Sequence, residues 1–358
     1  MKLWRSCHNP LEVEALEVCF FHFDKIINQG RTTIIVNSNN EGNLLQENTM
    51  KLVVTIPAYN EEKSLGTVIK EIPKNIEGID EIQIIIINDG STDHTVDNAI
   101  QAGADKILSH KRNMGLAQTF RDGLDAALEM GADIIVNTDA DFQYNGTEIP
   151  KLIAPILEGK ADIVLGDRQI DTLDHMPRGN LWGNKLATQV TRWATGLPIK
   201  DAQTGFRAFS REAALRMNLT GEYTYTQETL IQAANKNLKI EQIPVEFRRR
   251  EGKSRLISSI FRYARSAGVT IFRSFGAYHP FTIFSAIGLG CIVLGLIFGF
   301  RVIIHFFSTG MVTPYLPSAL LTTVLIIVGC LAILFGLLAD MLKTQRMIEE
   351  EILYRLKK

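Results

Sequence analysis

The segment Ile134–Gln143, with the sequence IIVNTDADFQ, decides the fold of this chain. An apolar run typical of a buried strand ends in two carboxylates and an amide. Side chains alternate between the faces of a strand, so continued strand geometry would point Asp139, Asp141 and Gln143 at one place. Mg²⁺ is commonly held by one or two carboxylates together with substrate phosphates. The segment therefore predicts a metal–diphosphate site at the carboxyl end of a strand. The alternative is a polar turn after a core strand.

Strand and helix patterns alternate on both sides of this segment. We predict four further strands, at 52–56, 82–87, 105–108 and 163–166. The run 82–87 is almost wholly apolar, which is typical of a strand buried on both faces of a parallel sheet. Helices are expected from about residue 64 and over 116–130. This order predicts a doubly wound, Rossmann-like α/β domain with ligands beyond the carboxyl ends of its strands.

Polar motifs follow four of these strands, at 57–61 (PAYNE), 89–91 (DGS), 139–141 (DAD) and 166–168 (GDR). A single cleft at one edge of the sheet explains all four. The chain has no Walker A loop and no Gly-x-Gly-x-x-Gly after its first strand, which argues against an ATPase or a dinucleotide-binding protein. The formal net charge of -1 gives no electrostatic reason to expect nucleic acid as a partner.

Two segments without charged residues, 281–300 and 318–339, predict a transmembrane helical hairpin. About 20 apolar residues span a hydrocarbon core of roughly 30 Å. Two buried core helices are the alternative. Lys and Arg are concentrated before the first segment and after the second, whereas the link between them has only Arg301. The positive-inside rule then predicts a two-span protein of the cell membrane with its soluble domain in the cytoplasm.

Five regions are expected along the chain. Ile257, Ile260 and Phe261 recur at helical spacing beside arginines, which favours a helix in the membrane interface over an ordinary packed helix. Met50 directly precedes the first strand, so we expect it to be the natural start, after a disordered or mis-annotated extension. The regions are the extension 1–49, the α/β domain 50–256, amphipathic juxtamembrane helices 257–278, the hairpin 279–342 and a cytoplasmic tail 343–358.

Seven motifs, in order, resemble those of the family 2 glycosyltransferases of GT-A fold. The closer resemblance is to the polyprenyl- and dolichyl-phosphate glycosyltransferases of the dolichol-phosphate mannose synthase type. It extends over about 52–255, and the hairpin also suits this group. Thr204 stands where Ser is usual and Arg255 where Lys is common. The motifs lie at 57–61, 88–93 (NDGSTD), 112–115 (RNMG), 139–143 (DADFQ), 166–168, 201–207 (DAQTGFR) and 247–255 (FRRREGKSR).

The resemblance implies a nucleotide-sugar site and a divalent metal. Mg²⁺ or Mn²⁺ would neutralise the charge that grows on the leaving diphosphate. The implied metal ligands are Asp139, Asp141 and Gln143. The implied donor-binding residues are Pro57, Tyr59, Glu61, Asp89, Arg112 and Asp139.

The acceptor implied by the resemblance is a polyprenyl or dolichyl phosphate in the lipid bilayer. A phosphomonoester is largely ionised at neutral pH, so it needs cationic positioning more than a general base. Asp201 is the implied base or orienting carboxylate, and Arg168 and Arg207 complete the implied catalytic set. Further groups for the acceptor phosphate are Arg250, Ser254 and Arg255.

We therefore expect metal-dependent, inverting transfer of a hexose from UDP-glucose, UDP-GlcNAc or GDP-mannose, with UDP donors favoured. One alternative is transfer to a sugar hydroxyl of a polysaccharide or glycolipid, with Glu228 as the base. Another is a non-enzymatic membrane scaffold. Glycines in the first span, at 288, 290 and 295, allow close helix contacts and hence homo-oligomers without requiring them.

Overall fold

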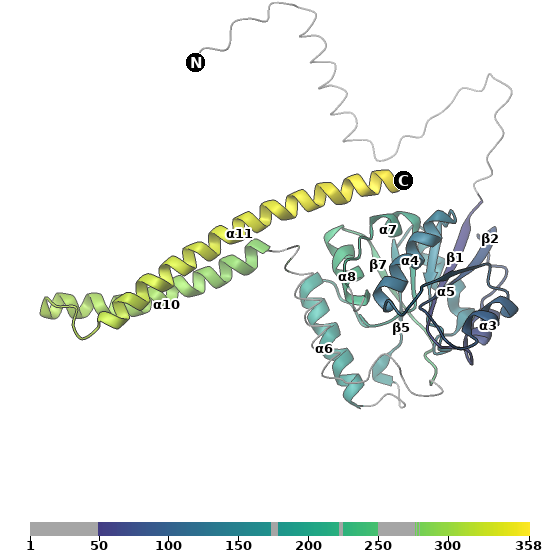
Figure 1. Cartoon of the computed structure of the whole chain (residues 1–358), viewed down its shortest axis with the longest axis horizontal. Helices are drawn as coiled ribbons and strands as arrows, with labels where there is room; N and C mark the ends of the chain where they lie inside the picture. Colours follow the sequence, from purple (N-terminus) through teal and green to yellow (C-terminus); the bar gives the residue numbers. More distant parts are fainter. Residues whose placement is uncertain (1–48, 173–177, 222–224, 250–275, 277, 279) are drawn as a thin grey trace, which may run out of the picture. The chain divides into compact units, whose positions relative to one another are not determined.

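The computed structural model describes residues 49–172, 178–221, 225–249, 276, 278 and 280–358 (Figure 1). Three predictions fall outside these residues. The extension 1–48 is one, and the juxtamembrane helices at 257–278 are another, apart from positions 276 and 278. The third is the acceptor motif that contains Arg250, Ser254 and Arg255.

The predicted strands and helices of the α/β domain are confirmed, with shifts of a few residues at their ends. The strands are β1 (Lys51–Ala58), β2 (Glu81–Asn88), β3 (Lys106–Ser109), β4 (Ile134–Asn137), β5 (Ile163–Asp167), β6 (Arg207–Ser210) and β7 (Ile240–Pro244). The helices are α2 (Leu65–Glu71), α3 (Thr95–Ala102), α4 (Leu116–Glu129), α5 (Ile149–Leu157), α6 (Arg178–Thr195), α7 (Arg211–Arg216) and α8 (Thr226–Asn235), with short 3₁₀ turns at Gly146–Glu148 and Ile170–Thr172.

The strands form one sheet in the order β3-β2-β1-β4-β6-β5-β7. All neighbours pair in parallel except β6, which is antiparallel to both β4 and β5. The parallel pairing that is typical of a doubly wound sheet therefore holds between the other strands and is interrupted at β6. Arg207, its first residue, lies opposite Asn137, the last residue of β4. The chain thus enters β6 at the carboxyl edge of its neighbours, and the preceding loop 201–206 lies at that edge.

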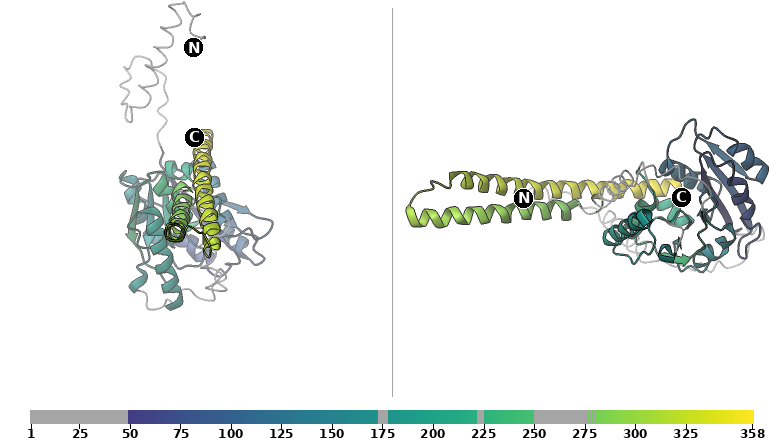
Figure 2. Two further views of the ribbon diagram at one scale, coloured as in Figure 1. Left: turned by 90° about the vertical axis from the view of Figure 1, so that its left-hand side faces the viewer. Right: turned by 90° about the horizontal axis from the view of Figure 1, so that it is seen from below.

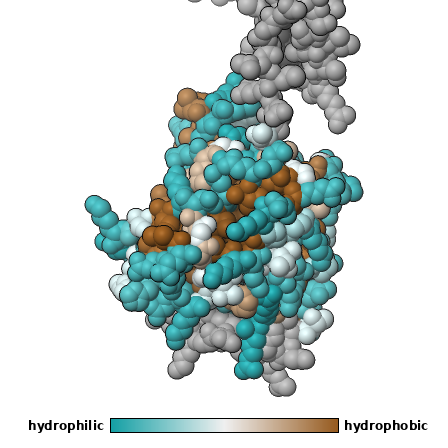
Figure 3. All heavy atoms as spheres, turned by 90° about the vertical axis from the view of Figure 1, so that its right-hand side faces the viewer, coloured by the Kyte–Doolittle hydropathy of each residue, from teal (hydrophilic) through white to brown (hydrophobic). Residues whose placement is uncertain are grey.

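Helices cover both faces of the sheet. Side chains alternate between the two faces along each strand, so one strand contributes to a hydrophobic core on each face. Leu52, Val54 and Ile56 of β1 pack in a core with α2, α3 and α5. Val53 of the same strand packs on the opposite face, in a core with α4, α7 and α8. Figure 3 shows one face of the domain, where hydrophobic patches lie among hydrophilic side chains. The result is a three-layer domain in which the strands β1, β4 and β5 are almost wholly buried, whereas the edge strands β3 and β7 are partly exposed.

The hairpin consists of α10 (Pro280–Thr309) and α11 (Leu316–Lys357), which lie side by side (Figures 1 and 2). Both helices are long and apolar enough to cross a membrane. Many of their large hydrophobic residues are exposed, as expected of a lipid-facing surface. The charged tail from residue 343 onward is helical, because it continues α11. It contacts the α/β domain through Tyr354, which donates to Glu212, and through the Lys357–Asp125 ion pair at 2.8 Å.

Two glycines let α10 and α11 approach closely. A Cβ built on Gly288 would lie 2.6 Å from the carbonyl oxygen of Gly329, and the reverse distance is also 2.6 Å. We expect Gly288→Val to lower the free energy of unfolding in detergent by about 1–3 kcal/mol through overpacking. Gly290→Val is the matched control, because a Cβ there meets nothing within 4 Å. Equal thermal unfolding of the two variants would contradict this packing.

Candidate active site

A cavity of about 270 Å³ lies at the carboxyl ends of β1, β2 and β4, beside the start of α4. A single cleft was predicted for four strand-end motifs, and three of them, at 57–61, 89–91 and 139–141, contribute residues to this cavity. The fourth motif, at 166–168 after β5, does not line it. Five of the six predicted donor-binding residues, and Asp141, line it. The lining residues are Pro57, Ala58, Tyr59, Glu61, Asp89, Asn113, Gly115, Leu116, Thr119, Asp139, Ala140 and Asp141. The sixth, Arg112, does not line it, although its neighbour Asn113 does.

The loop after β1 is tied to the loop after β2. The backbone N–H of Asn60 donates to the hydroxyl of Ser91 at 2.9 Å, and that of Thr92 donates to the Asn60 side chain at 2.8 Å. The N–H of Glu61 donates to Thr95 at 2.9 Å. Asn60 has a φ of 54°, a left-handed conformation that asparagine tolerates well. These bonds fix the wall of the cavity that presents Tyr59 and Glu61.

Asp89 is nearly buried and organises the turn before α4. Its Oδ1 accepts from the N–H of Met114 at 2.7 Å, and its Oδ2 accepts from the N–H of Gly115 at 3.0 Å. His110 lies 2.8 Å from the same Oδ1. Sequence analysis missed His110, although a polar residue directly after β3 is the same strand-end signal that marked Asp89 and Asp139.

The two aspartates of the DAD motif line the cavity, but Gln143 does not lie with them. β4 ends at Asn137, and Phe142 has a φ of 65°. The alternation of side chains along the strand therefore stops before Asp139. It cannot place Gln143 beside the two aspartates, so the prediction of Gln143 as a third metal ligand on that ground is wrong. Its side-chain amide instead donates to the carbonyl of Arg248 at 3.3 Å.

The remaining donor set still fits a hard divalent cation. Among the residues that the structure describes, no three His, Cys, Asp or Glu side chains converge on one point. Two carboxylates, from Asp139 and Asp141, line the same cavity. Mg²⁺ sites often use only one or two protein carboxylates and complete their shell with substrate phosphates and water.

Gly205 lies against the carboxylate of Asp139. A Cβ at this position would lie 2.7 and 2.8 Å from the two carboxylate oxygens of Asp139. We expect Gly205→Ala to displace that carboxylate and to lower metal-dependent transfer about tenfold or more, with the fold retained. Gly183→Ala on α6 is the control, because its Cβ meets nothing within 4 Å. Full activity of purified Gly205→Ala would contradict the placement of Asp139.

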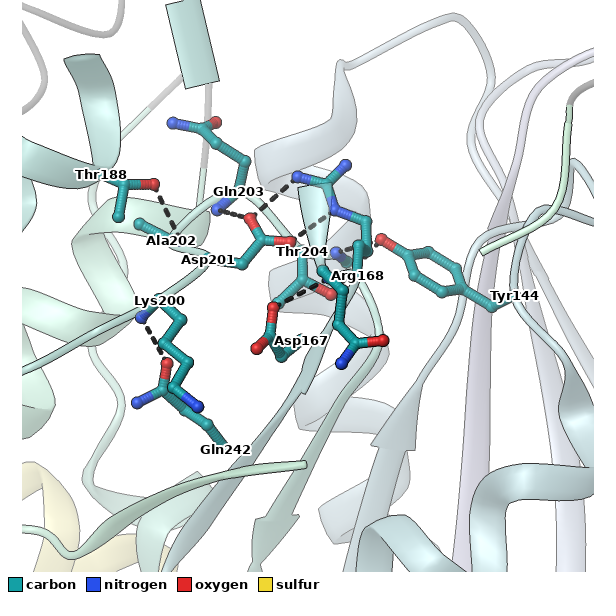
Figure 4. Close-up of polar contacts among 12 residues, drawn as sticks. Tyr144, Asp167, Arg168, Thr188, Lys200, Asp201, Ala202, Gln203, Thr204 and Gln242 are labelled. Carbon is teal, nitrogen blue, oxygen red and sulfur yellow. Dashed lines mark hydrogen bonds and ion pairs between the residues drawn. The ribbon is translucent and has the colours of Figure 1, made fainter. Parts of the chain in front are cut away.

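Arg168 and Asp201 form a nearly buried ion pair (Figure 4). The guanidinium donates to both carboxylate oxygens, at 2.6 and 2.9 Å. Burial alone would raise the pKa of Asp201, but the charge and hydrogen bonds of Arg168 outweigh it and lower that pKa. The same pairing outweighs burial to raise the pKa of Arg168. Asp201 is therefore held ionised by its partner, which suits an orienting carboxylate better than a base.

Tyr144, which was not among the predicted site residues, holds the loop 201–206. Its hydroxyl accepts from the N–H of Gly205 at 2.9 Å and lies 3.3 Å from the hydroxyl of Thr204. Burial raises the pKa of Tyr144 to about 12, so its hydroxyl keeps its proton. Nothing in its sequence context distinguishes it from a core aromatic residue.

Arg207 does not contact the cavity, contrary to prediction. Its side chain is fully buried and donates to the carbonyls of Ala202, Thr204 and Thr226. It also donates to the hydroxyl of Thr229. A phosphate cannot reach a guanidinium without exposed surface, so the predicted catalytic role is wrong. Arg207 instead fastens the loop 201–206 to α8.

Glu228, the base of the alternative function, is also buried and hydrogen-bonded. Its carboxylate accepts from the N–H groups of Thr220 and Gly221, both at 2.9 Å. These bonds hold the turn before α8. Glu228 does not line the cavity described above. The geometry therefore gives it a structural role.

Comparison with known proteins identifies the family. Residues 53–216 match the family model described as glycosyl transferase family 2. A dolichyl-phosphate hexose transferase of Haloferax volcanii is 31% identical over 205 residues, which are 57% of this chain and 86% of that protein. The chain belongs to glycosyltransferase family 2. A UDP-N-acetylglucosamine–dolichyl-phosphate N-acetylglucosaminyltransferase of Methanococcus voltae is 32% identical, and the match covers 54% of this chain and 84% of that one.

The fold of this glycosyltransferase is of GT-A type. Glucosyl-3-phosphoglycerate synthase of Mycobacterium tuberculosis, crystallised with UDP, superposes with a TM-score of 0.52 at 23% sequence identity. The match covers 63% of this chain and 80% of that one. A further structure of that enzyme holds Mn²⁺ as well as UDP. The predicted combination of a GT-A domain and a C-terminal pair of apolar helices is thus confirmed.

Proposed function

We propose that this glycosyltransferase moves a hexose from a nucleotide sugar to a polyprenyl or dolichyl phosphate. The observation that carries the proposal is the combination, in one chain, of a carboxylate-lined cavity with two helices apolar enough to span a membrane. Relatives that are 31% and 32% identical are named as transferases to dolichyl phosphate. The favoured donors are UDP-glucose and UDP-GlcNAc, with GDP-mannose as the third candidate.

The cavity would hold the nucleotide diphosphate, with Tyr59 and Glu61 on one wall and the 113–119 segment on the other. Mg²⁺ or Mn²⁺, held by Asp139 and Asp141, would supply positive charge to the leaving diphosphate. A phosphate oxygen of the acceptor attacks the anomeric carbon, the bond from that carbon to the diphosphate breaks, and the nucleoside diphosphate leaves. One such displacement inverts the anomeric centre.

Arg168 would position the acceptor phosphate, and Asp201 would orient Arg168. A guanidinium has five N–H donors, and Arg168 uses two of them to bind Asp201. The remaining donors can bind the acceptor phosphate. The ionised acceptor needs no proton removed. This agrees with the lowered pKa of Asp201, which makes that carboxylate a weak base.

We also propose that catalysis takes place on the cytoplasmic face of the cell membrane. In the sequence, Lys and Arg are concentrated before the first span and after the second, at 255, 262, 265 and 273 and at 343, 346, 357 and 358. The link between the helices has only Arg301. This distribution supports the orientation through the positive-inside rule.

The test uses the purified full chain in detergent with Mn²⁺, polyprenyl phosphate and a panel of radiolabelled UDP- and GDP-sugars. We expect label from one donor to enter the organic phase. The alternative function predicts transfer only to sugar hydroxyls and its loss in Glu228→Gln. If the protein is a non-enzymatic membrane scaffold, nucleotide binding that depends on the metal is not expected. Either result would replace the proposal.

A further inference from the structure

His110 bridges two carboxylates at the edge of the cavity. Its Nδ1 lies 2.8 Å from Asp89 Oδ1, and its Nε2 lies 2.9 Å from Asp122 Oδ2. The side chains of His110 and Asp89 are only 12% and 6% exposed, and that of Asp122 is 28% exposed. Ionised carboxylates accept hydrogen bonds only. The ring of His110 therefore lies between two carboxylates, with one at each of its nitrogens.

The bridge reaches the cavity through Asp89. That carboxylate accepts from the backbone N–H groups of Met114 and Gly115, which form the turn into α4. Gly115 is the N-terminal cap of α4 with a φ of 90°, and glycine has no side chain that could cap the helix. The segment from Asn113 to Thr119 is one wall of the cavity. The position of this wall thus depends on Asp89, and the position of Asp89 depends on His110.

Asp122 completes the bridge from within α4. Its second oxygen accepts from the Gln118 side chain at 2.8 Å, one turn earlier on the same helix. His110 thereby joins the end of β3, the end of β2 and the first turns of α4 in one network. Hydrogen bonds to an ionised carboxylate are stronger than those between neutral groups, and more so when they are shielded from water.

We propose that His110 is a positioning residue of the donor site: it holds Asp89 and the turn at Met114 and Gly115 in the form that receives the nucleotide. This assignment rests on the proposed function, because it takes the cavity to be the site of a nucleoside diphosphate. His110 itself does not line the cavity. It therefore acts on the ligand through Asp89.

The test compares His110→Ala with the matched variant His94→Ala. His94 also pairs with an aspartate, Asp97, at 3.1 Å, but these side chains are 80% and 65% exposed. In the full chain without nucleotide, we expect amide hydrogen exchange of the segment 110–119 to be faster in His110→Ala only. We expect the affinity for the preferred nucleoside diphosphate, UDP or GDP, to fall about tenfold in the same variant.

Kinetics separate positioning from a general loss of structure. We expect His110→Ala to raise the donor KM about tenfold and to leave kcat within about threefold, because no reacting group is removed. Asp122→Asn keeps a hydrogen-bond partner for Nε2 but removes the carboxylate charge, so we expect it to raise the donor KM less than His110→Ala does. If His110→Ala leaves exchange and nucleotide affinity unchanged, the proposal is overturned. If the wild-type chain binds neither UDP nor GDP, the proposed function fails, and the donor-site assignment with it. The exchange data would then still show whether His110 holds the turn.

Discussion

Replacing Asp141 by asparagine is expected to lower sugar transfer about a hundredfold or more. Asp141 and Asp139 are the two carboxylates of the DAD motif, and both line the cavity. Lewis-acid stabilisation by a divalent cation contributes several kcal/mol to a transition state, and each 1.36 kcal/mol is about a factor of ten in rate. The amide keeps the shape of the side chain but removes the charge that a hard cation requires.

The measurement is transfer of label to the lipid acceptor over a range of Mn²⁺ concentrations. Asp97→Asn serves as the control, because Asp97 is an exposed carboxylate on α3. We expect Asp141→Asn to bind nucleotide weakly and without dependence on Mn²⁺. Wild-type activity in Asp141→Asn, or metal-independent transfer by the unaltered chain, would remove the metal from the mechanism.

The strands were predictable because their signal is local. The apolar residues of β1 and β2 are nearly continuous and pack into cores on both faces of the sheet. A continuous apolar run therefore predicts burial on both faces. The polar residues after these strands were equally visible. Parallel strands carry their carboxyl ends to one edge, so Tyr59, Asp89 and Asp139 were expected together and line one cavity.

The loop 201–206 and strand β6 were not predictable in the same way. β6 has only four residues, Arg207–Ser210, and its first is an arginine. An arginine within a glycosyltransferase motif suggests an anion contact. Only the fold shows that backbone carbonyls, such as those of Thr204 and Thr226, accept its hydrogen bonds. Whether an arginine binds a ligand or a loop depends on non-local contacts that the sequence does not display.

The DAD motif shows a second limit on what can be predicted from the sequence. Strand alternation placed Asp139 and Asp141 together, and both line the cavity although β4 has already ended. The same argument failed for Gln143, because the left-handed Phe142 turns the chain between them. A positive φ is uncommon at a phenylalanine, so this conformation cannot be predicted from the residue type.

Asp201→Asn is expected to destabilise the chain by about 3–5 kcal/mol at neutral pH, because it leaves the guanidinium of Arg168 nearly buried without its partner. The side chain of Asp201 has no exposed surface and that of Arg168 is 10% exposed. Denaturant unfolding of the full chain in detergent measures the effect. Asp171→Asn is the matched control, since the Lys185–Asp171 pair is largely exposed and such pairs contribute about 0–1 kcal/mol.

A double-mutant cycle isolates the pair. Arg168→Gln combined with Asp201→Asn removes both charges, so we expect the double variant to lose less stability than the sum of the single variants. Additive losses would show that the two side chains contribute independently. Transfer activity in the double variant should remain low, because Arg168 is the proposed contact of the acceptor phosphate.

The contribution of Asp201 should also disappear in acid. Arg168 lowers the pKa of Asp201 in the folded chain despite burial, whereas an unfolded aspartate titrates near pH 3.9. A carboxylate with a depressed folded pKa stabilises the fold above its unfolded pKa, and this stabilisation is lost as the pH falls through the folded value. The difference in stability between the wild type and Asp201→Asn should therefore be constant from about pH 7 to pH 5 and shrink below about pH 4. A difference that persists unchanged at pH 3 would mean that the aspartate stabilises the fold through its shape and hydrogen bonds rather than through its charge.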